Sequence, residues 1–291
     1  MRVSIFGVAL LSACGSGVAG YDGLLEPPER GVQLLSEPFV LEAGQERTRC
    51  YHLNMNNAEE LEVVRFQTNQ RPGQHHFNIF MSDLEREDGF GPCPDEFELF
   101  VGARPIVDGS SGAVDYRFPD GMAFPLPPNT LVIMQLHWIN VTDAPAEQQF
   151  ALNLYTAEEP ARTHVDLYGF TTLEITLPPH ERTTIQKDCT IRDTIGLLSM
   201  SSHFHQRGVL ATTQVIRDGR SDQVYSNDRW DDPEVEFFDD PIPVTNGDVV
   251  RFECTYDNAD DFTVEYGPSA ADEMCFVFGY YFPKKGLIPC F

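Results

Sequence analysis

Short segments with the composition of β-strands follow one another along almost the whole chain of 291 residues. They are rich in β-branched and aromatic residues and are separated by Pro, Gly, Asn and Asp. No helical pattern runs for more than two turns, so apolar residues must be buried between sheets. We therefore predict an all-β fold of sandwich or barrel type. The segments are 46–54, 61–69, 75–82, 97–103, 131–140, 150–156, 164–172, 194–205, 209–219, 248–258 and 275–283.

The length of the chain allows two domains or one large all-β domain. A polar, Pro-containing stretch at 155–164 interrupts the strand-like segments near the middle. We place a domain boundary there, which predicts an N-terminal domain over 36–157 and a C-terminal domain over 158–291.

The first residues have the pattern of an export signal. Arg2 precedes an apolar run from Val3 to Leu11, which is too short to span a membrane. Leu11 to Cys14 resemble a bacterial lipobox, in which Cys14 would carry the lipid; the alternative is an ordinary signal peptide that contains a cysteine. We predict a lipoprotein leader over 1–14, a flexible tether over 15–35, and a membrane-anchored protein on the periplasmic or cell-surface side.

The chain carries 20 Lys and Arg residues against 45 Asp and Glu residues, for a net charge of −25. This acidic surface repels phosphate backbones, so nucleic acid is not an expected partner. It does not oppose the binding of a cation.

Seven cysteines include Cys14, which leaves six in the predicted folded part. An even number in an exported chain indicates disulfides. No two of the six form a CxxC pair, which disfavours a thiolate zinc site.

Five histidines stand in patterns that could bind a metal. His203 and His205 are two residues apart, so on a strand they share a face. His75 and His76 are adjacent and could reach one ion only at a strand end or an irregularity, which Pro72-Gly73 could supply. Taken singly, each of these histidines, and His137, could instead be an ordinary histidine at the surface, at a strand end or hydrogen-bonded in the core.

Met274 strengthens the interpretation of these histidines as metal ligands. By itself it would be a core methionine beside a disulfide. Together, the first half offers three imidazoles and the second offers two imidazoles and a thioether. Imidazole suits copper, zinc, iron and nickel, whereas a thioether favours copper. The combination predicts two copper ions that can change oxidation state.

At these residues the sequence resembles the copper type II, ascorbate-dependent monooxygenases, over roughly residues 36–291. In that family an HH pair and a later His hold one copper, and HxH with a Met holds the other. The resemblance implies His75, His76 and His137 as one ligand set and His203, His205 and Met274 as the other. It also implies that Gln135 lies behind the first set.

The family pattern further implies the disulfides Cys50–Cys93, Cys189–Cys290 and Cys254–Cys275. The implied fold is a pair of antiparallel jelly-roll sandwiches, each with one copper, facing each other across a water-filled cleft. The implied activity is hydroxylation of a substrate C–H bond with O₂ and a reductant such as ascorbate, on a small-molecule or peptide substrate. The alternatives are a copper-binding lipoprotein without turnover and an adhesion or carbohydrate-binding sandwich with incidental histidines.

The sequence departs from the peptidylglycine enzymes of this family at three positions. Those enzymes hold a substrate carboxylate with Arg, Asn and Tyr, whereas the matching positions here are Ser201, Phe276 and Phe278. An uncharged or partly aromatic substrate would fit these side chains better than a carboxylate. Three histidines without a ligand pattern are expected at the surface or in loops: His52, His164 and His180. Asp272 and Glu273 are expected in a solvated turn, with the alternative that they orient a metal ligand.

Overall fold

The computed structural model describes residues 25–69, 73–94, 102–109, 114–231, 233, 235–267, 269, 271–286 and 288–290. All 24 elements named within these residues are β-strands, so the predicted all-β class is confirmed. The described part of the chain contains no helix with the length and apolarity needed to cross a membrane. The predicted segment 97–103 and the leader 1–14 fall largely or entirely outside the described residues.

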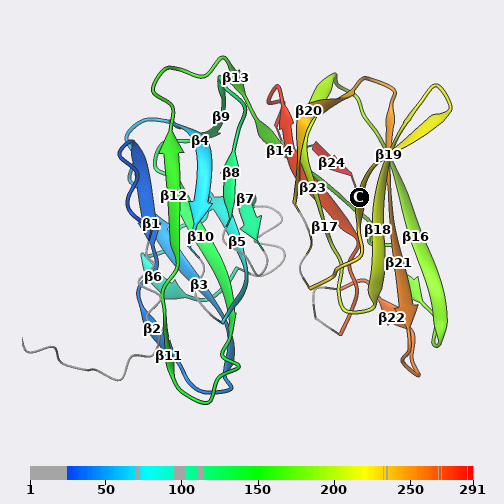
Figure 1. The fold of residues 1–291 in the computed structure, drawn as a ribbon, viewed down its shortest axis with the longest axis horizontal. Coiled ribbons are helices and arrows are strands. Elements are labelled where there is room, and N and C mark those ends of the chain that lie inside the picture. Colours follow the sequence, from blue (N-terminus) through cyan, green and yellow to red (C-terminus); the bar gives the residue numbers. More distant parts are fainter. Residues whose placement is uncertain are drawn as a thin grey trace, which may run out of the picture.

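Strands before residue 165 pair among themselves (Figure 1). One sheet has the order β1-β12-β4-β9-β13, with β8 also on β4, and the other has the order β6-β3-β10-β5-β7. A short pair, β2 with β11, completes this half. The bounds in the first sheet are β1 Gly31–Leu35, β12 Ala151–Thr156, β4 Leu61–Thr68, β9 Met122–Leu126, β13 Thr163–His164 and β8 Asp115–Arg117. The others are β6 Gly89–Gly91, β3 Glu46–Asn54, β10 Leu131–Ile139, β5 Gln74–Ser82, β7 Ala103–Gly109, β2 Phe39–Leu41 and β11 Ala146–Gln148.

Strands after residue 165 form the second half in the same manner. One sheet has the order β20-β17-β23-β14-β24, another β16-β21-β18-β19, and β15 pairs with β22. The first sheet comprises β20 Glu236–Val244, β17 Ile195–His203, β23 Phe276–Phe282, β14 Asp166–Thr171 and β24 Ile288–Cys290. The rest are β16 Glu181–Thr190, β21 Val249–Asn258, β18 Gly208–Arg217, β19 Arg220–Asn227, β15 Thr176–Leu177 and β22 Val264–Glu265.

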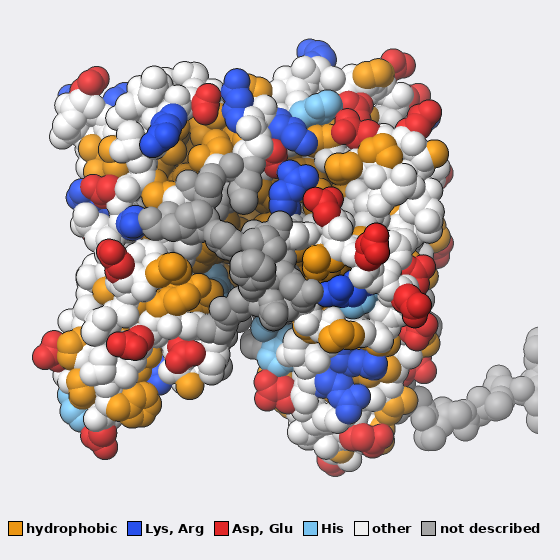
Figure 2. Space-filling view, turned by 180° about the vertical axis from the view of Figure 1, so that it is seen from behind, with side chains coloured by type: hydrophobic (Ala, Val, Ile, Leu, Met, Phe, Trp, Pro, Cys, Tyr) orange, Lys and Arg blue, Asp and Glu red, His pale blue; other side chains and the backbone are white. Residues whose placement is uncertain are grey.

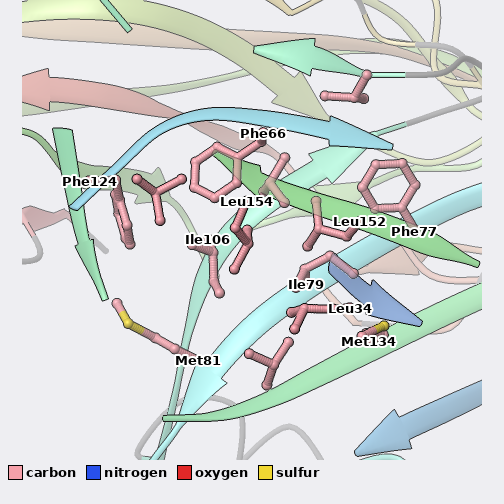
Figure 3. Packing of buried hydrophobic residues seen from close by; sticks show 14 of the residues in the cluster. Leu34, Phe66, Phe77, Ile79, Met81, Ile106, Phe124, Met134, Leu152 and Leu154 are labelled. Atoms are coloured by element: carbon pink, nitrogen blue, oxygen red, sulfur yellow. The ribbon is translucent and has the colours of Figure 1, made fainter. Parts of the chain in front are cut away.

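The core of the first half lies between its two sheets. Phe66 and Leu152 come from one sheet, Phe77 and Met134 from the other, and their side chains meet in one buried cluster (Figure 3). Because successive side chains of a strand point to opposite faces, each sheet can fill this space with every second residue. This interdigitation is the packing of a β-sandwich.

Three disulfides fasten the sheets. They join Cys50 to Cys93, Cys189 to Cys290 and Cys254 to Cys275. The pairing implied by the family resemblance is therefore confirmed. The described part of the chain is thereby cross-linked in both halves, as is common in proteins of oxidising compartments.

The two halves are in direct apolar contact. Tyr280 of β23 belongs to the same buried cluster as the first-half core, and its ring lies 4.9 Å from that of Phe118. Its hydroxyl donates a hydrogen bond to the backbone carbonyl of Ile106 in β7. Tyr116 and Phe237 add a second aromatic contact, with ring centroids 4.9 Å apart. This apolar contact therefore joins the two halves of the protein that carry the histidines.

Asp108 in β7 places a carboxyl group beside this contact, and the hydroxyl of Tyr116 donates to its backbone carbonyl over 3.2 Å. Burial raises the pKa of Asp108 to about 7. The folded protein therefore holds a proton there between about pH 4 and 7 that the unfolded chain has lost, so stability must fall as the pH rises through this window.

We expect Asp108→Asn to remove this part of the pH dependence, which amounts to at most about 4 kcal/mol in the free energy of unfolding. Urea unfolding at pH 5 and pH 8 measures it. The exposed Asp120→Asn serves as the control, and it should show the same pH dependence as the unaltered protein. If the free energy of unfolding of Asp108→Asn depended on pH as steeply as that of the unaltered protein, the assignment of this pH dependence to Asp108 would be refuted.

Candidate metal centres

The first centre is built on the pairing of β5 with β10. His76 lies directly opposite His137, while Trp138 lies opposite Gln74, so His75 is an extra residue in β5. This register shift is the irregularity that the adjacent histidines were predicted to need, because a bulge re-aims the side chains beside it. The backbone of His75 belongs to β5, but its side chain lies outside the described residues.

The imidazoles of His76 and His137 face each other. Their Nδ1 atoms are 3.3 Å apart and their ring centroids 4.8 Å apart. Two nitrogens about 2.0 Å from one ion, at an angle of about 110°, would lie about 3.3 Å from each other. The pair therefore fits two ligands of a single metal ion.

His137 is also bound on its other side. Its Nε2 atom is 2.8 Å from Oε1 of Glu46, the first residue of β3. A carboxylate is an acceptor, so Nε2 is the donor in this bond, and in the singly protonated ring Nδ1 keeps its lone pair. The sequence offered no sign of Glu46, which is 91 residues away in the chain and belongs to no recognisable motif.

Gln135 shares the face of β10 that carries His137. Its Oε1 atom accepts a hydrogen bond of 3.2 Å from the amide of Asn78, its cross-strand neighbour in β5. The opposite face of β10 packs Leu136 and Trp138 into the core. The bond between Gln135 and Asn78 thus ties together the two strands that carry the imidazole pair.

The second centre lies where β17 ends. His203 is the last residue of this strand, Phe204 is buried, and the rings of His203 and His205 are 5.1 Å apart. The N–H of Gly208 donates to the carbonyl of His205 and turns the chain. The two imidazoles therefore lie side by side although His205 has left the strand.

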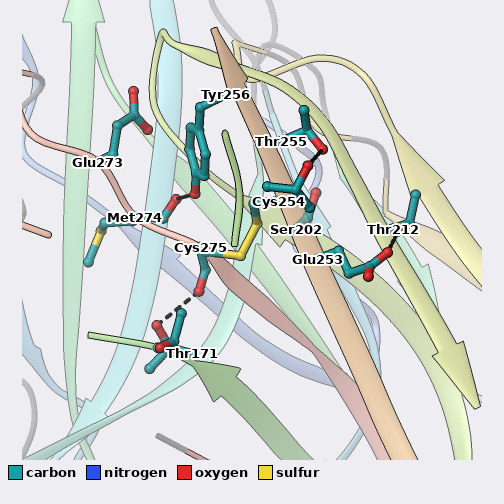
Figure 4. The surroundings of a disulfide bond; sticks show 12 residues. Thr171, Ser202, Thr212, Glu253, Cys254, Thr255, Tyr256, Glu273, Met274 and Cys275 are labelled. Carbon is teal, nitrogen blue, oxygen red and sulfur yellow. Dashed lines mark hydrogen bonds between the residues drawn. A yellow bond between two sulfur atoms is a disulfide. The ribbon is translucent and has the colours of Figure 1, made fainter. Parts of the chain in front are cut away.

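The segment before Met274 is bonded directly to His205. The Nδ1 atom of His205 is 3.0 Å from the carbonyl of Asp272, and its backbone N–H donates to Glu273 over 2.9 Å. Met274 follows at once, and the Tyr256 hydroxyl fixes its carbonyl over 2.5 Å. Figure 4 shows its thioether pointing away from the Cys254–Cys275 disulfide. The thioether is thus presented from the chain segment that touches His205.

Glu273 corrects the expectation of a solvated turn. Its side chain is completely buried, and it accepts hydrogen bonds of 2.9 Å from the backbone N–H groups of His205 and Arg207. Burial raises the pKa of this carboxyl, while these two N–H groups lower it. The carboxylate fastens the histidine loop to the methionine segment.

The imidazole of His203 is neutral in the folded protein. Its pKa is lowered to about 4, first by desolvation among the surrounding protein atoms and then by the like charge of His205. Solvent still reaches the ring, since the residue is exposed. A neutral, accessible imidazole is the form that binds a metal.

Among the described side chains, no group of three or more His, Cys, Asp or Glu residues is arranged to hold a metal ion. Each predicted set includes only two described imidazoles, because the His75 side chain is outside the described residues and Met274 is a thioether. Figure 2 shows that the two halves part below their contact, with imidazoles along the edges of the opening.

Comparison with known proteins identifies the second half. Residues 164–291 match the family model "Copper type II ascorbate-dependent monooxygenase, C-terminal domain". Over this half the chain is similar to the copper type II ascorbate-dependent monooxygenases. The resemblance seen in the sequence is thereby confirmed, and this matched part contains the second candidate centre with His203, His205 and Met274.

Two human proteins are also similar to this chain. Putative DBH-like monooxygenase protein 2 is 24% identical over 207 residues, which are 64% of this chain and 41% of the relative. Dopamine beta-hydroxylase is 24% identical over 242 residues, 74% of this chain and 39% of the relative. The match thus spans about two fifths of each relative. The solved major capsid protein P2 of bacteriophage PM2 aligns over 88% of this chain and 100% of its own, at 10% identity and a TM-score of 0.35, which is too low for any conclusion.

Three further histidines differ from one another in their surroundings. His52 is buried in β3, so the expectation of a surface or loop position was wrong; it lies against Gly91, near the Cys50–Cys93 disulfide. His164 is bonded to Glu62 over 2.7 Å and His180 to Asp261 over 2.9 Å. These carboxylate pairs account for two of the three.

We expect Glu273→Ala to lower the free energy of unfolding by about 3–5 kcal/mol, because it leaves the backbone N–H groups of His205 and Arg207 without their acceptor and removes one of the two carboxylates paired with the Arg207 guanidinium. It should also weaken copper binding at the second centre. Urea unfolding and copper titration measure the two effects. Asp272→Asn is the matched control, since Asp272 contacts His205 only through its backbone carbonyl. Equal stability of the two variants would contradict this role of Glu273.

Proposed function

We propose that this protein is a copper-dependent monooxygenase that hydroxylates a substrate C–H bond with O₂ and an electron donor such as ascorbate. The observation that carries the proposal is the pair of imidazole clusters, one in each half, of which the second lies in a domain of the copper monooxygenase family. Two redox-active ions on separate sandwiches suit a reaction that needs electrons and O₂ together.

His75, His76 and His137 would hold one copper, and His203, His205 and Met274 the other. When bound, copper supplies electron transfer and O₂ activation. The protein residues hold and orient these ligands: Glu46 and the Asp272 carbonyl take the outer N–H groups of His137 and His205. The nitrogens that remain are neutral lone-pair donors, which suit copper.

The surface beside the second centre favours an uncharged or aromatic substrate. In the register of β17 and β23, Ser201 lies opposite Phe278 and His203 opposite Phe276, so all four side chains share a face. The phenylalanine rings are half-buried and 5.4 Å apart. The Oγ atom of Ser201 is buried and has no hydrogen-bond partner among the described residues. This face offers half-buried ring surface and no charged group among these four side chains, which would suit an uncharged aromatic body.

We further propose that the mature chain is a lipoprotein attached through Cys14 and the tether of 15–35. The supports are the sequence pattern of the leader and the three disulfides, which are typical of exported proteins. Cys14 and the residues up to 24 lie outside the described residues. Metabolic labelling with a fatty acid, compared between the unaltered protein and Cys14→Ser, tests the attachment.

A copper-binding lipoprotein without turnover is the rival, because it needs the same ligands. Copper counting and ascorbate-dependent O₂ uptake against a panel of neutral aromatic compounds and peptides separate the two. Two copper ions per chain with substrate-dependent O₂ uptake support the enzyme. Two copper ions without product from any member of the panel would favour the rival.

We expect Met274→Ile to abolish turnover and to leave copper binding at the first centre unchanged, because isoleucine keeps the bulk but removes the thioether. Metal content and O₂ uptake measure these effects. Met200→Ile, a buried methionine of β17, is the matched control and should keep both properties. Full activity in Met274→Ile would remove Met274 from the ligand set.

The complementary substitution His137→Ala should weaken copper binding at the first centre and spare the second. Turnover should fall because electrons no longer enter, while Met274-dependent copper binding persists. Stopped-flow reduction of the loaded protein by ascorbate measures the first centre. Unchanged electron uptake would count against His137 as a ligand.

A further inference from the structure

We propose that Glu46 is a positioning residue for the first copper centre. Its carboxylate holds the proton of His137 on Nε2 and thereby commits Nδ1 to the metal. This inference rests on the proposed function only for the identity of the metal, since the carboxylate–imidazole bond is present in the described structure.

The geometry follows from the register of β3 and β10. Glu46 lies opposite Ile139, and Thr48 lies opposite His137, so Glu46 is diagonal to His137 on the same face. A glutamate is long enough to cross this diagonal, and its Oε1 atom reaches Nε2 of His137 at 2.8 Å. Its position at the start of β3 therefore determines which ring nitrogen it meets.

The bond selects one tautomer of His137. An ionised carboxylate can only accept, so the proton must stay on Nε2. The lone pair of Nδ1 then points to the side where Nδ1 of His76 lies, 3.3 Å away. A carboxylate behind a ligating imidazole fixes ring orientation and raises the basicity of the ligand.

Two other carboxylate–imidazole bonds show that this arrangement is particular to Glu46. Glu62 bonds His164 over 2.7 Å and Asp261 bonds His180 over 2.9 Å. Among the described ring pairs, neither of those imidazoles faces a second one, whereas His137 faces His76. They provide controls in which the same bond is removed away from the candidate metal.

The exposure of the Glu46 side chain favours a role in positioning His137 over a role in fold stability. The Glu46 side chain is 64% exposed, whereas that of His137 is 13% exposed. An exposed ion pair contributes little to fold stability because water competes for both partners. Removal of the carboxylate should therefore leave folding unchanged and alter the properties of the metal.

The negative charge also has a consequence for the oxidation state. A carboxylate behind the ligand stabilises Cu(II) more than Cu(I), because the former carries the larger charge. Loss of Glu46 should weaken Cu(II) binding about tenfold or more and Cu(I) binding less. A tenfold change in the ratio of the two affinities corresponds to a rise of about 59 mV in the reduction potential.

The experiment compares Glu46→Gln and Glu46→Ala with the controls Glu62→Gln and Asp261→Asn in the full chain. We expect Cu(II) affinity at the first centre to fall about tenfold or more in Glu46→Ala, and less in Glu46→Gln, whose amide oxygen can still accept from Nε2. Copper affinity at the second centre and the unfolding midpoint should remain unchanged in both Glu46 variants. The two control variants should keep the Cu(II) affinity of the first centre. The first-centre potential should rise.

A measurement without copper tests the tautomer directly. In ¹⁵N spectra of the copper-free protein, His137 should show a single Nε2–H tautomer, and Glu46→Ala should show a mixture. Unaltered spectra together with unaltered Cu(II) affinity would overturn the proposal, as would equal affinity losses in the controls. If the unaltered protein bound no copper, the proposed function would fail, while the tautomer of His137 would still decide the role of Glu46.

Discussion

The candidate chemistry of this protein depends on strand register. Side chains alternate across a strand, so a slip of one residue would send every ligand of that strand to the opposite face. His76 meets His137 because β5 and β10 are paired in one register up to His137 and shifted by one residue beyond it. In the second half, pairing of β17 with β23 sets His203 opposite Phe276, two residues after Met274.

The contact between the halves connects the two candidate centres through the same paired strands. Tyr280 lies on β23, the strand that follows Met274, and its ring packs into the core of the first half. Its hydroxyl bonds β7, which pairs with β5 and therefore with the strand of His76. The two candidate centres are thus connected through paired strands and one buried aromatic ring. A rearrangement that separated them would have to disrupt this apolar contact.

The parts of the site that the sequence predicted are those with local patterns. Apolar runs marked the strands of His137 and His203, and the resemblance supplied the three disulfides. Glu46 was not recognised as a supporting residue, because its bond to His137 spans 91 residues. The sequence allowed Glu273 to orient a ligand but favoured a solvated turn, because its bond to His205 spans 68 residues. A carboxylate beside another acidic residue in a Ser- and Ala-rich stretch indicates a solvated turn. Only the tertiary structure shows that Glu273 is buried and that it accepts hydrogen bonds from two backbone N–H groups.

The two centres use their supporting carboxylates in different ways. In the first, an exposed carboxylate takes the Nε2 proton of His137, which leaves Nδ1 toward His76. In the second, a backbone carbonyl takes the Nδ1 proton of His205, which leaves Nε2, while the buried Glu273 accepts from the backbone N–H groups of His205 and Arg207. The first ligand therefore has an anion behind it and the second a neutral dipole. Because an anion stabilises the higher oxidation state, Glu46 would lower the reduction potential of a copper ion bound at the first centre, as we propose, relative to one supported by a carbonyl alone.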